Sequence, residues 1–144
     1  MDFFDALHVS SSGLSAQRLR MNLISANLAN MNTTRTKTGG PYRRKDPIFA
    51  AQVPQGSFRE ILRNRQEMLT KVAVVGIVED SRAPIRKYEP HHPEADRNGY
   101  VSLPNINVME EMVNMISATR SYEANVSAIK AAKAMALKAL EIGQ

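Results

Sequence analysis

The chain has 144 residues, a formal net charge of +5 and no cysteine. The lack of cysteine excludes disulfides, thiolate zinc sites and cysteine nucleophiles. The positive charge is local, because residues 31–65 hold eight basic and two acidic side chains, a net charge of +6, and the rest of the chain sums to −1. The charge therefore describes one basic segment rather than a basic protein.

The sequence shows no targeting segment and no membrane-spanning segment. Asp2 and Asp5 stand where a cleaved secretory signal would carry Lys or Arg. No uncharged apolar run approaches the roughly 20 residues that a membrane helix needs. If the protein leaves the cytosol, we expect it to use a route without a cleaved signal.

The proline-free ends of the chain predict two long helices. All seven prolines lie between residues 41 and 104, and proline breaks the interior of a helix. Residues 3–30 place apolar side chains at helical spacing and predict the first helix. Ser10 to Gly13 is a weak point where this helix could kink, because serine and glycine are poor helix formers.

The middle of the chain predicts a small β unit. Four segments read as strands, at 46–53, 71–79, 84–89 and 100–104. Gly76 could mark a bulge in the second of them. Residues 57–69 predict a short helix, since Ser57 and Glu60 form a capping-box pattern. We expect a small antiparallel unit inserted between the terminal helices.

Residues 107–142 predict a second and longer helix. Asn107 is a good N-cap residue, and Glu110 three positions later completes a capping-box pattern. Apolar and small side chains follow at 3–4 spacing over about four heptads, and Gly143 is suited to end the helix. Such a helix would be roughly 50 Å long, so it should protrude or pack lengthwise.

Candidate chemical sites are weak in this sequence. His91 and His92 stand near carboxylates, but adjacent histidines usually point apart and make a poor metal pair. Residues 94–105 partly match a calcium loop, yet the last position is Asn105 rather than a bidentate glutamate, and a tight turn at Asn98 is favoured. No Ser-His-Asp pattern is legible, and we expect no enzymatic activity, no cofactor and no metal.

The basic segment 35–45 leaves two interpretations open. Its arginines and lysines, with Tyr42, could grip nucleic-acid phosphates. The Gly39-Gly40 pair is not a phosphate-binding P-loop, because no Gly-Lys-Ser/Thr opens a helix there. The same segment could instead be a charged loop that packs on the acidic surface of a partner, and spacing alone does not choose between the two.

Small and amide side chains are frequent in both predicted helices, and they suit closely packed helices. If such packing is intermolecular and head-to-tail, it generates a helical filament. In chain order, the segments SSSGLSAQRLRMNLISANLANMNTTRT, GGPYRRK, VVGIVED and HPEADRNGYVSLPNINVMEEMVNMISATRSYEAN resemble the bacterial flagellar basal-body rod proteins. The resemblance covers essentially the whole chain, and the middle segments are similar to the proximal members of that family.

The resemblance implies an α+β fold. Long N- and C-terminal helices would form an antiparallel coiled-coil-like hairpin, with a small β-containing domain inserted between them. Residues 1–32 and 105–144 would be the helices of an inner domain, and residues 33–104 would be the basic loop and the outer domain. The implied function is a structural subunit of the proximal rod. It would polymerise helically through its terminal helices into a drive shaft that transmits torque and encloses the export channel.

The resemblance also implies partners and a location. The partners would be further copies of the chain, neighbouring rod proteins (FlgB, FlgF and the distal rod proteins) and the flagellar type III export apparatus, with the surrounding ring proteins as further candidates. Nucleic acid is not among them. The location would be the flagellar basal body, in a rod that spans the periplasm, reached by type III export.

Assembly roles are expected for two groups of residues. The family pattern and the helical spacing place the first group in the inner helices: Leu14, Met21, Asn27, Leu28, Asn30, Met112, Met115, Tyr122, Asn125, Val126 and Ile129. The second group lies in the basic loop, where it would contact neighbouring rod or ring proteins: Pro41, Tyr42, Arg43 and Arg44.

Overall fold

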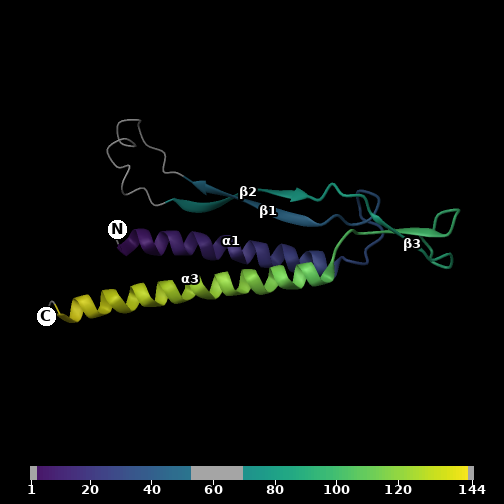
Figure 1. The fold of residues 1–144 in the computed structure, drawn as a ribbon. Helices are drawn as coiled ribbons and strands as arrows, with labels where there is room; N and C mark the ends of the chain where they lie inside the picture. The colour runs from purple at the N-terminus through teal and green to yellow at the C-terminus, as the bar shows by residue number, and fades with distance from the viewer. Residues whose placement is uncertain (1–2, 53–69, 143–144) are drawn as a thin grey trace, which may run out of the picture.

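Two long helices from the ends of the chain lie side by side in the computed structural model, which describes residues 3–52 and 70–142 (Figure 1). The helices are α1 (Phe3–Ala29) and α3 (Val108–Ile142). They run antiparallel, so both chain ends lie at the same end of the pair (Figure 1). The predicted fold class, α+β with paired terminal helices and a β unit between them, is confirmed.

Helix α1 continues without a break through the weak point at Ser10 to Gly13. Ser12 sits on this turn and uses its hydroxyl twice. The Oγ atom donates to the Val9 carbonyl at 2.7 Å and accepts the Val72 amide N–H at 3.1 Å. A tertiary contact with the neighbouring strand thus offsets the low helix propensity of the segment, so the kink that the sequence allowed is not formed.

The start of α3 agrees with the predicted cap. Asn107 Oδ1 accepts the Met109 amide N–H at 3.0 Å and the Glu110 amide N–H at 3.5 Å, which satisfies donors that lack an intrahelical partner. The helix is 35 residues long against 27 for α1. Its C-terminal end therefore extends past the start of α1 (Figure 1). Gly143, the expected terminator, lies outside the described residues.

The β unit consists of two separate antiparallel hairpins. One pairs β1 (Lys45–Gln52) with β2 (Lys71–Glu79), and the other pairs β3 (Ile85–Tyr88) with β4 (Tyr100–Leu103). The four predicted strands are thus confirmed within the described residues. The predicted helix at 57–69 lies outside them.

Gly76 stands beside an irregularity in the first hairpin, as predicted. Ile48 pairs with Gly76, but the next residue, Phe49, pairs with Val74, so Val75 is the extra residue of a β-bulge. A bulge bends a strand and increases its twist. The bend lets the hairpin follow the length of α1.

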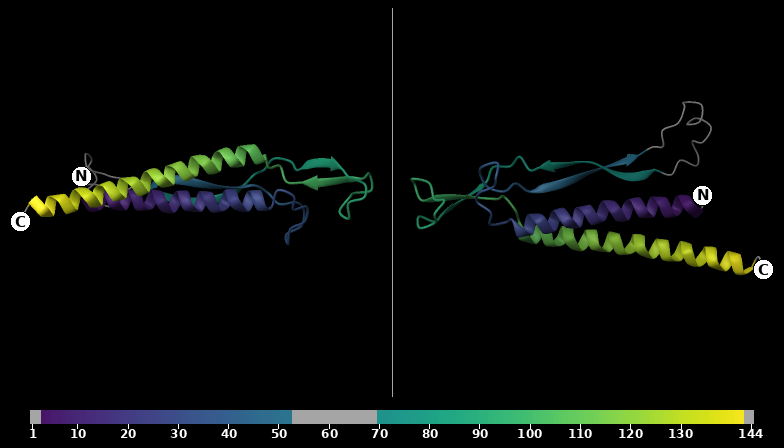
Figure 2. Two further views of the ribbon diagram at one scale, coloured as in Figure 1. Left: turned by 90° about the horizontal axis from the view of Figure 1, so that it is seen from below. Right: turned by 180° about the vertical axis from the view of Figure 1, so that it is seen from behind.

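The molecule has three layers over most of its length. Helix α1 lies in the middle, with α3 against one side and the β1–β2 hairpin against the other (Figures 1 and 2). The β3–β4 hairpin projects beyond the end of the helix pair that is remote from the chain termini (Figure 2). Within the described residues, the buried apolar side chains are few and mostly small: Ala16, Ile24, Val101, Ala118 and Ala132.

Candidate assembly site

The contact between α1 and α3 includes small side chains at close approaches. Gly13 faces the Asn125 amide so closely that a Cβ on this glycine would lie 3.1 Å from Asn125 Oδ1. Nearer the middle of the pair, Thr119 Oγ1 lies 3.6 Å from Met21 Sδ. Such surfaces let two backbones approach closely, but they offer few features that distinguish one alignment of the helices from the next.

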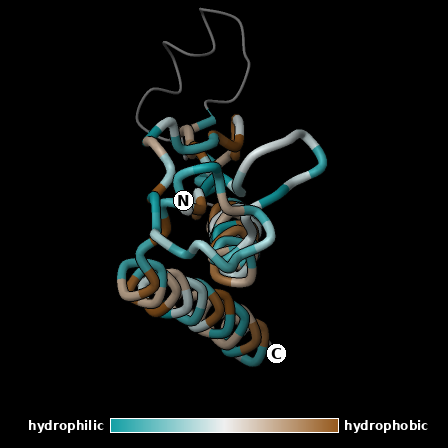
Figure 3. Tube along the Cα trace, turned by 90° about the vertical axis from the view of Figure 1, so that its right-hand side faces the viewer, coloured by the Kyte–Doolittle hydropathy of each residue, from teal (hydrophilic) through white to brown (hydrophobic). Residues whose placement is uncertain are grey.

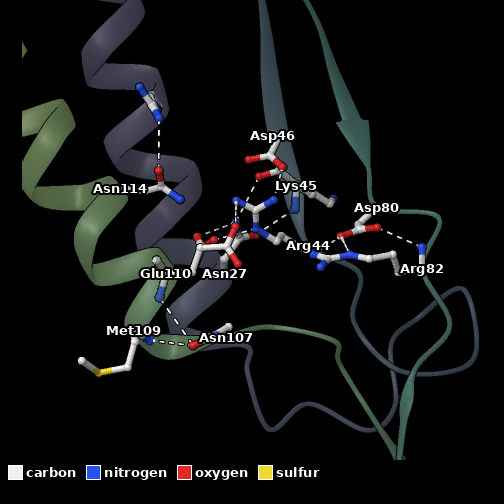
Figure 4. Close-up of polar contacts among 12 residues, drawn as sticks. Asn27, Arg44, Lys45, Asp46, Asp80, Arg82, Asn107, Met109, Glu110 and Asn114 are labelled. Carbon is white, nitrogen blue, oxygen red and sulfur yellow. Dashed lines mark hydrogen bonds and ion pairs between the residues drawn. The ribbon is translucent and has the colours of Figure 1, made fainter.

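One end of the helix pair holds linked polar groups that we call the polar cluster: Asn27, Tyr42, Arg44, Lys45 and Glu111. Figure 4 labels Asn27, Arg44 and Lys45 of this cluster. Asn27 is fully buried. Its Oδ1 accepts the Lys45 amide N–H at 2.9 Å and the Tyr42 hydroxyl at 3.1 Å. Its Nδ2 donates to the Lys45 carbonyl at 3.0 Å and to Glu111 Oε2 at 3.1 Å. All four hydrogen-bonding positions of the amide are used, and they join α1 to β1 and α3.

Glu111, on the first turn of α3, is fully buried and is paired with Arg44. Arg44 Nε donates to Glu111 Oε1 at 2.6 Å, and the same guanidinium pairs with Asp46 and lies 4.0 Å from Glu110. Burial acts to lower the pKa of Arg44, but the hydrogen bond and charge of Glu111 outweigh it and the pKa is raised. The buried carboxylate thus faces a permanent positive charge, the condition under which a buried ion pair is tolerated.

Two further groups complete this end of the molecule. Burial, and then the negative charges of Glu79 and Glu111, raise the pKa of Tyr42, so its hydroxyl keeps its proton and can donate. Asp80 donates its amide N–H to the Arg44 carbonyl at 2.8 Å. The hydrogen bond from Arg82, at 2.6 Å, lowers the pKa of Asp80 (Figure 4).

The side of α3 that faces away from α1 is apolar near its start. We call it the outer face of α3, and its exposed members are Met109, Met112, Val113 and Ile116. Hydrophobic residues occur around the circumference of α3, not only on the side toward α1 (Figure 3). Farther along, the end of α3 that extends past α1 exposes Met135, Leu137 and Leu140.

The first hairpin is also apolar on exposed positions. Ile48, Phe49, Val72, Val75, Ile77 and Val78 are all exposed. The hairpin and α3 lie on opposite sides of α1 (Figure 2). The molecule thus presents exposed apolar groups on both of its outer layers, an arrangement typical of a subunit that buries surface against neighbours.

The predicted inner-helix residues fall into three environments. Asn27 is fully buried inside the chain, and Met112 is 49% exposed on the outer face of α3. The remaining members are half-buried: Leu14, Met21, Leu28, Asn30, Met115, Tyr122, Asn125, Val126 and Ile129. Their contacts within the chain do not test a role in assembly, which stays a prediction.

The predicted loop residues divide in the same way. Tyr42 and Arg44 turn inward and belong to the polar cluster. Pro41 is half-buried and Arg43 is exposed. These two line a hollow of about 220 Å³ together with Lys45 and neighbouring loop residues. A role of this loop in contacting a partner also stays a prediction.

Most cations of the basic segment 35–45 already face carboxylates of the chain. Arg35 lies 3.5 Å from Glu94, and Lys45 lies 3.4 Å from Glu79, while Arg44 is bound to Glu111. The Arg44 guanidinium is thus held by a buried carboxylate and withdrawn from phosphate, whereas the pairs of Arg35 and Lys45 are exposed and weak.

The turn between β3 and β4 follows the expectation for Asn98. Asp96 Oδ1 accepts the amide N–H groups of Asn98 and Tyr100 at 2.8 and 2.9 Å, and Gly99 adopts a φ of 78°. The backbone bonds from Tyr100 lower the pKa of Asp96. Within residues 3–52 and 70–142, no group of three or more metal-binding side chains occurs.

Glu111 is the member of the polar cluster that the sequence analysis does not single out, because only Glu110 fits the capping-box pattern at the start of α3. The available signal was its spacing. Glu111 stands four residues before Met115 and seven before Ala118, on the row that faces α1. A carboxylate on an inward row predicts a buried partner of opposite charge.

Comparisons with known proteins agree with this architecture. The family model described as "Flagella basal body rod protein" matches residues 7–37, and that described as "Flagellar basal body rod FlgEFG protein C-terminal" matches residues 97–142. These two matches cover most of α1 and all of α3. Among the described residues, no helix combines the length and apolar character that crossing a membrane requires.

Three relatives that match along their full length share the same name. The flagellar basal-body rod protein FlgC of Bacillus subtilis is 45% identical over all of both chains. The protein of that name from Borreliella burgdorferi is 44% identical over all of this chain and 99% of the relative. The one from Salmonella typhimurium is 36% identical over all of both chains.

Proposed function

This chain belongs to the family of the flagellar basal-body rod protein FlgC, and we propose on that premise that its paired terminal helices are the elements through which it polymerises. It is a structural, non-enzymatic subunit of the proximal rod of the flagellar basal body. The proposal concerns how this chain carries out that role.

The observation that supports the proposal most is the distribution of apolar surface. The family matches fall on α1 and α3, and α3 keeps an exposed apolar row on the side that α1 does not cover. Exposed apolar groups on both outer layers suit a contact between unlike faces of successive copies. Repetition of such a head-to-tail contact produces an open helical assembly rather than a closed dimer.

The proposed assembly is the tubular shaft of the rod. Copies of this chain, arranged helically through α1 and α3, would enclose the export channel and transmit torque from the motor. Many shallow helix contacts would share the load, because the exposed apolar side chains are spread along α3 and the β1–β2 hairpin rather than gathered at one point. The proposed assembly residues are Met112 on the outer face of α3, the half-buried residues named above and the loop residues Pro41, Tyr42, Arg43 and Arg44, with Asn27 acting from inside the chain.

The proposed partners and route follow from the family. The neighbours would be further copies, FlgB, FlgF and the distal rod proteins, with ring proteins around them. The chain would reach a rod that spans the periplasm by flagellar type III export, without a cleaved signal. The inner parts would be residues 1–32 and 105–144, and the outer part would be residues 33–104.

The experiment is complementation of a strain that lacks the gene for this chain. The strain receives the intact chain, a chain without residues 129–144, or a control with Lys138→Ala and Glu141→Ala. The control removes an exposed ion pair without shortening the helix. We expect complete rods by electron microscopy of basal bodies, and motility, with the intact chain and the control, and incomplete rods with the shortened chain.

Two results would contradict the proposal. One is normal basal bodies and swimming in the uncomplemented strain. The other is complete rods from the chain without residues 129–144, which would mean that the exposed end of α3 is not needed for assembly.

A further inference from the structure

We propose that the polar cluster sets the register of α1 against α3, with Asn27 and Glu111 acting as positioning residues. The proposal concerns the alignment of the helices within one chain. Only its consequence for rod assembly rests on the proposed function.

The first argument is the location of the buried polar groups. Asn27 and Glu111 are the two fully buried polar residues among those described, and they face each other across the helix contact at 3.1 Å. Most other side chains in the contact are small or half-buried, with Ile24 as the large buried exception. Apolar and half-buried groups are less particular about their partners than a fully buried amide and carboxylate are.

The second argument is what a slide would do to Asn27. A displacement of one turn moves α3 by about 5.4 Å along α1. Met115 or Asn107, four residues after or before Glu111, would then replace it opposite the amide. Met115 is not a strong hydrogen-bond acceptor, and Asn107 Oδ1 already accepts the Met109 and Glu110 amide N–H groups. The Nδ2 group would therefore lose a partner, and the Glu111 carboxylate would lose both Asn27 and Arg44. Buried polar groups without partners are the groups a fold avoids most strongly.

The third argument is that the same atoms hold the β layer. Asn27 contacts both the amide N–H and the carbonyl of Lys45, the first residue of β1. Arg44, one residue earlier, binds Glu111. The cluster therefore aligns three elements at one point, and the opposite outer layers of the molecule are fixed relative to each other by it.

We expect such a cluster to affect the alignment of the two helices more than the free energy of unfolding. Replacing a buried ion pair by apolar side chains of similar size often leaves stability unchanged. A single buried asparagine, by contrast, can determine the alignment and number of helices in a coiled coil. In this chain the correct register would place the outer face of α3 and the β1–β2 hairpin at the positions along the helix axis that contacts with neighbouring copies require.

The test uses disulfide formation in the full chain, which contains no cysteine of its own. The pair Met21→Cys with Thr119→Cys reports the native register, because these two side chains touch. The pairs Met21→Cys with Met115→Cys and Met21→Cys with Tyr122→Cys report slides of about one turn in the two directions. Disulfides form only between backbones about 4–7 Å apart, so each pair reports one alignment.

Each reporter pair is compared in three backgrounds: the unaltered cluster, Arg44→Met with Glu111→Leu, and Arg20→Met with Asn114→Leu. The last is a matched control, since Arg20 also bridges to Asn114 across the helix contact, at 3.3 Å, outside the cluster. With the cluster intact and in the control, we expect the native disulfide to dominate. Without the cluster, we expect the ratio of displaced to native disulfide to rise roughly tenfold or more.

The proposal is overturned if the chain without the cluster still forms the native disulfide alone, or if displaced disulfides are equally abundant with the cluster intact. If the chain with Arg44→Met and Glu111→Leu fails to fold, the disulfide between Cys at positions 21 and 119 is formed before folding is tested. Recovery of helical circular dichroism and cooperative melting then supports the proposal, because the disulfide fixes the native register in place of the polar cluster. If the chain with this disulfide stays unfolded, the polar cluster contributes only to stability, and the proposal is rejected.

Discussion

The two ends of the α1–α3 pair differ in how they are held. At the end remote from the chain termini, Asn27, Arg44 and Glu111 join both helices and β1 through buried hydrogen bonds. At the other end, the helices meet through small side chains, and α3 continues past α1 with Leu137 and Leu140 exposed. At one end buried polar groups join the two helices, while the outer face of α3 stays exposed there, and at the other end the last turns of α3 expose apolar side chains.

The difference separates two requirements of a subunit that polymerises. A fixed end gives every copy the same geometry, which a repeated contact needs. An incomplete end keeps apolar surface available until neighbours cover it. The predictions that follow test this division with substitutions at the polar end, in the middle of the pair and at the free end.

The largest effect on stability is expected from Glu111→Ala. The substitution leaves the Arg44 guanidinium and the Asn27 amide partly buried without their carboxylate, and removing one member of a buried pair costs about 3–5 kcal/mol. The free energy of unfolding from denaturant titration measures the loss. The control Glu123→Ala removes an exposed carboxylate from the same helix and should change that free energy by about 0.5 kcal/mol or less. If Glu111→Ala and Glu123→Ala lower the free energy of unfolding equally, the polar cluster contributes no more to stability than an exposed carboxylate does.

Asn27→Ala should have the next largest effect. The backbone groups of Lys45 and the Tyr42 hydroxyl lose their partner, and unsatisfied buried groups make a loss of about 2–3 kcal/mol the expected result. Thermal and denaturant unfolding measure it. Asn22→Ala, at an exposed position of α1, serves as the control and should be neutral or slightly stabilising, since alanine is the better helix former.

Gly13→Leu probes the small-residue part of the contact. A Cβ at this position would already lie 3.1 Å from the Asn125 side chain, and overpacking of a helix contact costs about 1–3 kcal/mol. Ser11→Leu, at an exposed position on the same turn, is the control that carries the same side chain away from α3. If both leucines are tolerated equally, close approach of the helices at Gly13 is not required.

Leu140→Ser should have the smallest effect on the isolated chain. Leu140 is 69% exposed on the end of α3 that extends past α1, so its free energy of unfolding should change by about 0.5 kcal/mol or less. A large loss of stability would show that this end packs within the chain, contrary to its assignment as a surface for neighbours.

Much of the fold could be predicted from the sequence. The absence of proline from both ends predicted α1 and α3, and Asn107 predicted where α3 begins. The β-branched run at 71–79 predicted β2, and Gly76 predicted the bulge. These features are local, since each depends on the conformational preference of a few consecutive residues.

What the sequence did not predict depends on contacts between distant residues. The continuity of α1 at Ser12 requires a hydrogen bond to Val72, 60 positions away. The burial of Glu111 requires Arg44, 67 positions away. Helical spacing places a side chain on a face of its helix, but it does not say whether that face meets the same chain or a neighbour, which is why Asn27 was expected among the assembly contacts.

The central claim, that assembly uses the face of α3 that the chain leaves uncovered, is tested most directly by two double substitutions. Met109→Asp with Ile116→Asp places two carboxylates seven residues apart on the outer face of α3, at positions 69% and 54% exposed. Ser117→Asp with Ala124→Asp places two carboxylates at the same spacing on exposed positions outside the apolar row. Unfolding of the purified chains and rod counts in complemented cells are measured for both.

The account predicts similar free energies of unfolding for both variants. It predicts complete rods for the Ser117 and Ala124 variant, and few or none for the Met109 and Ile116 variant. Complete rods in both would contradict the claim, because a charged outer face would then be compatible with assembly.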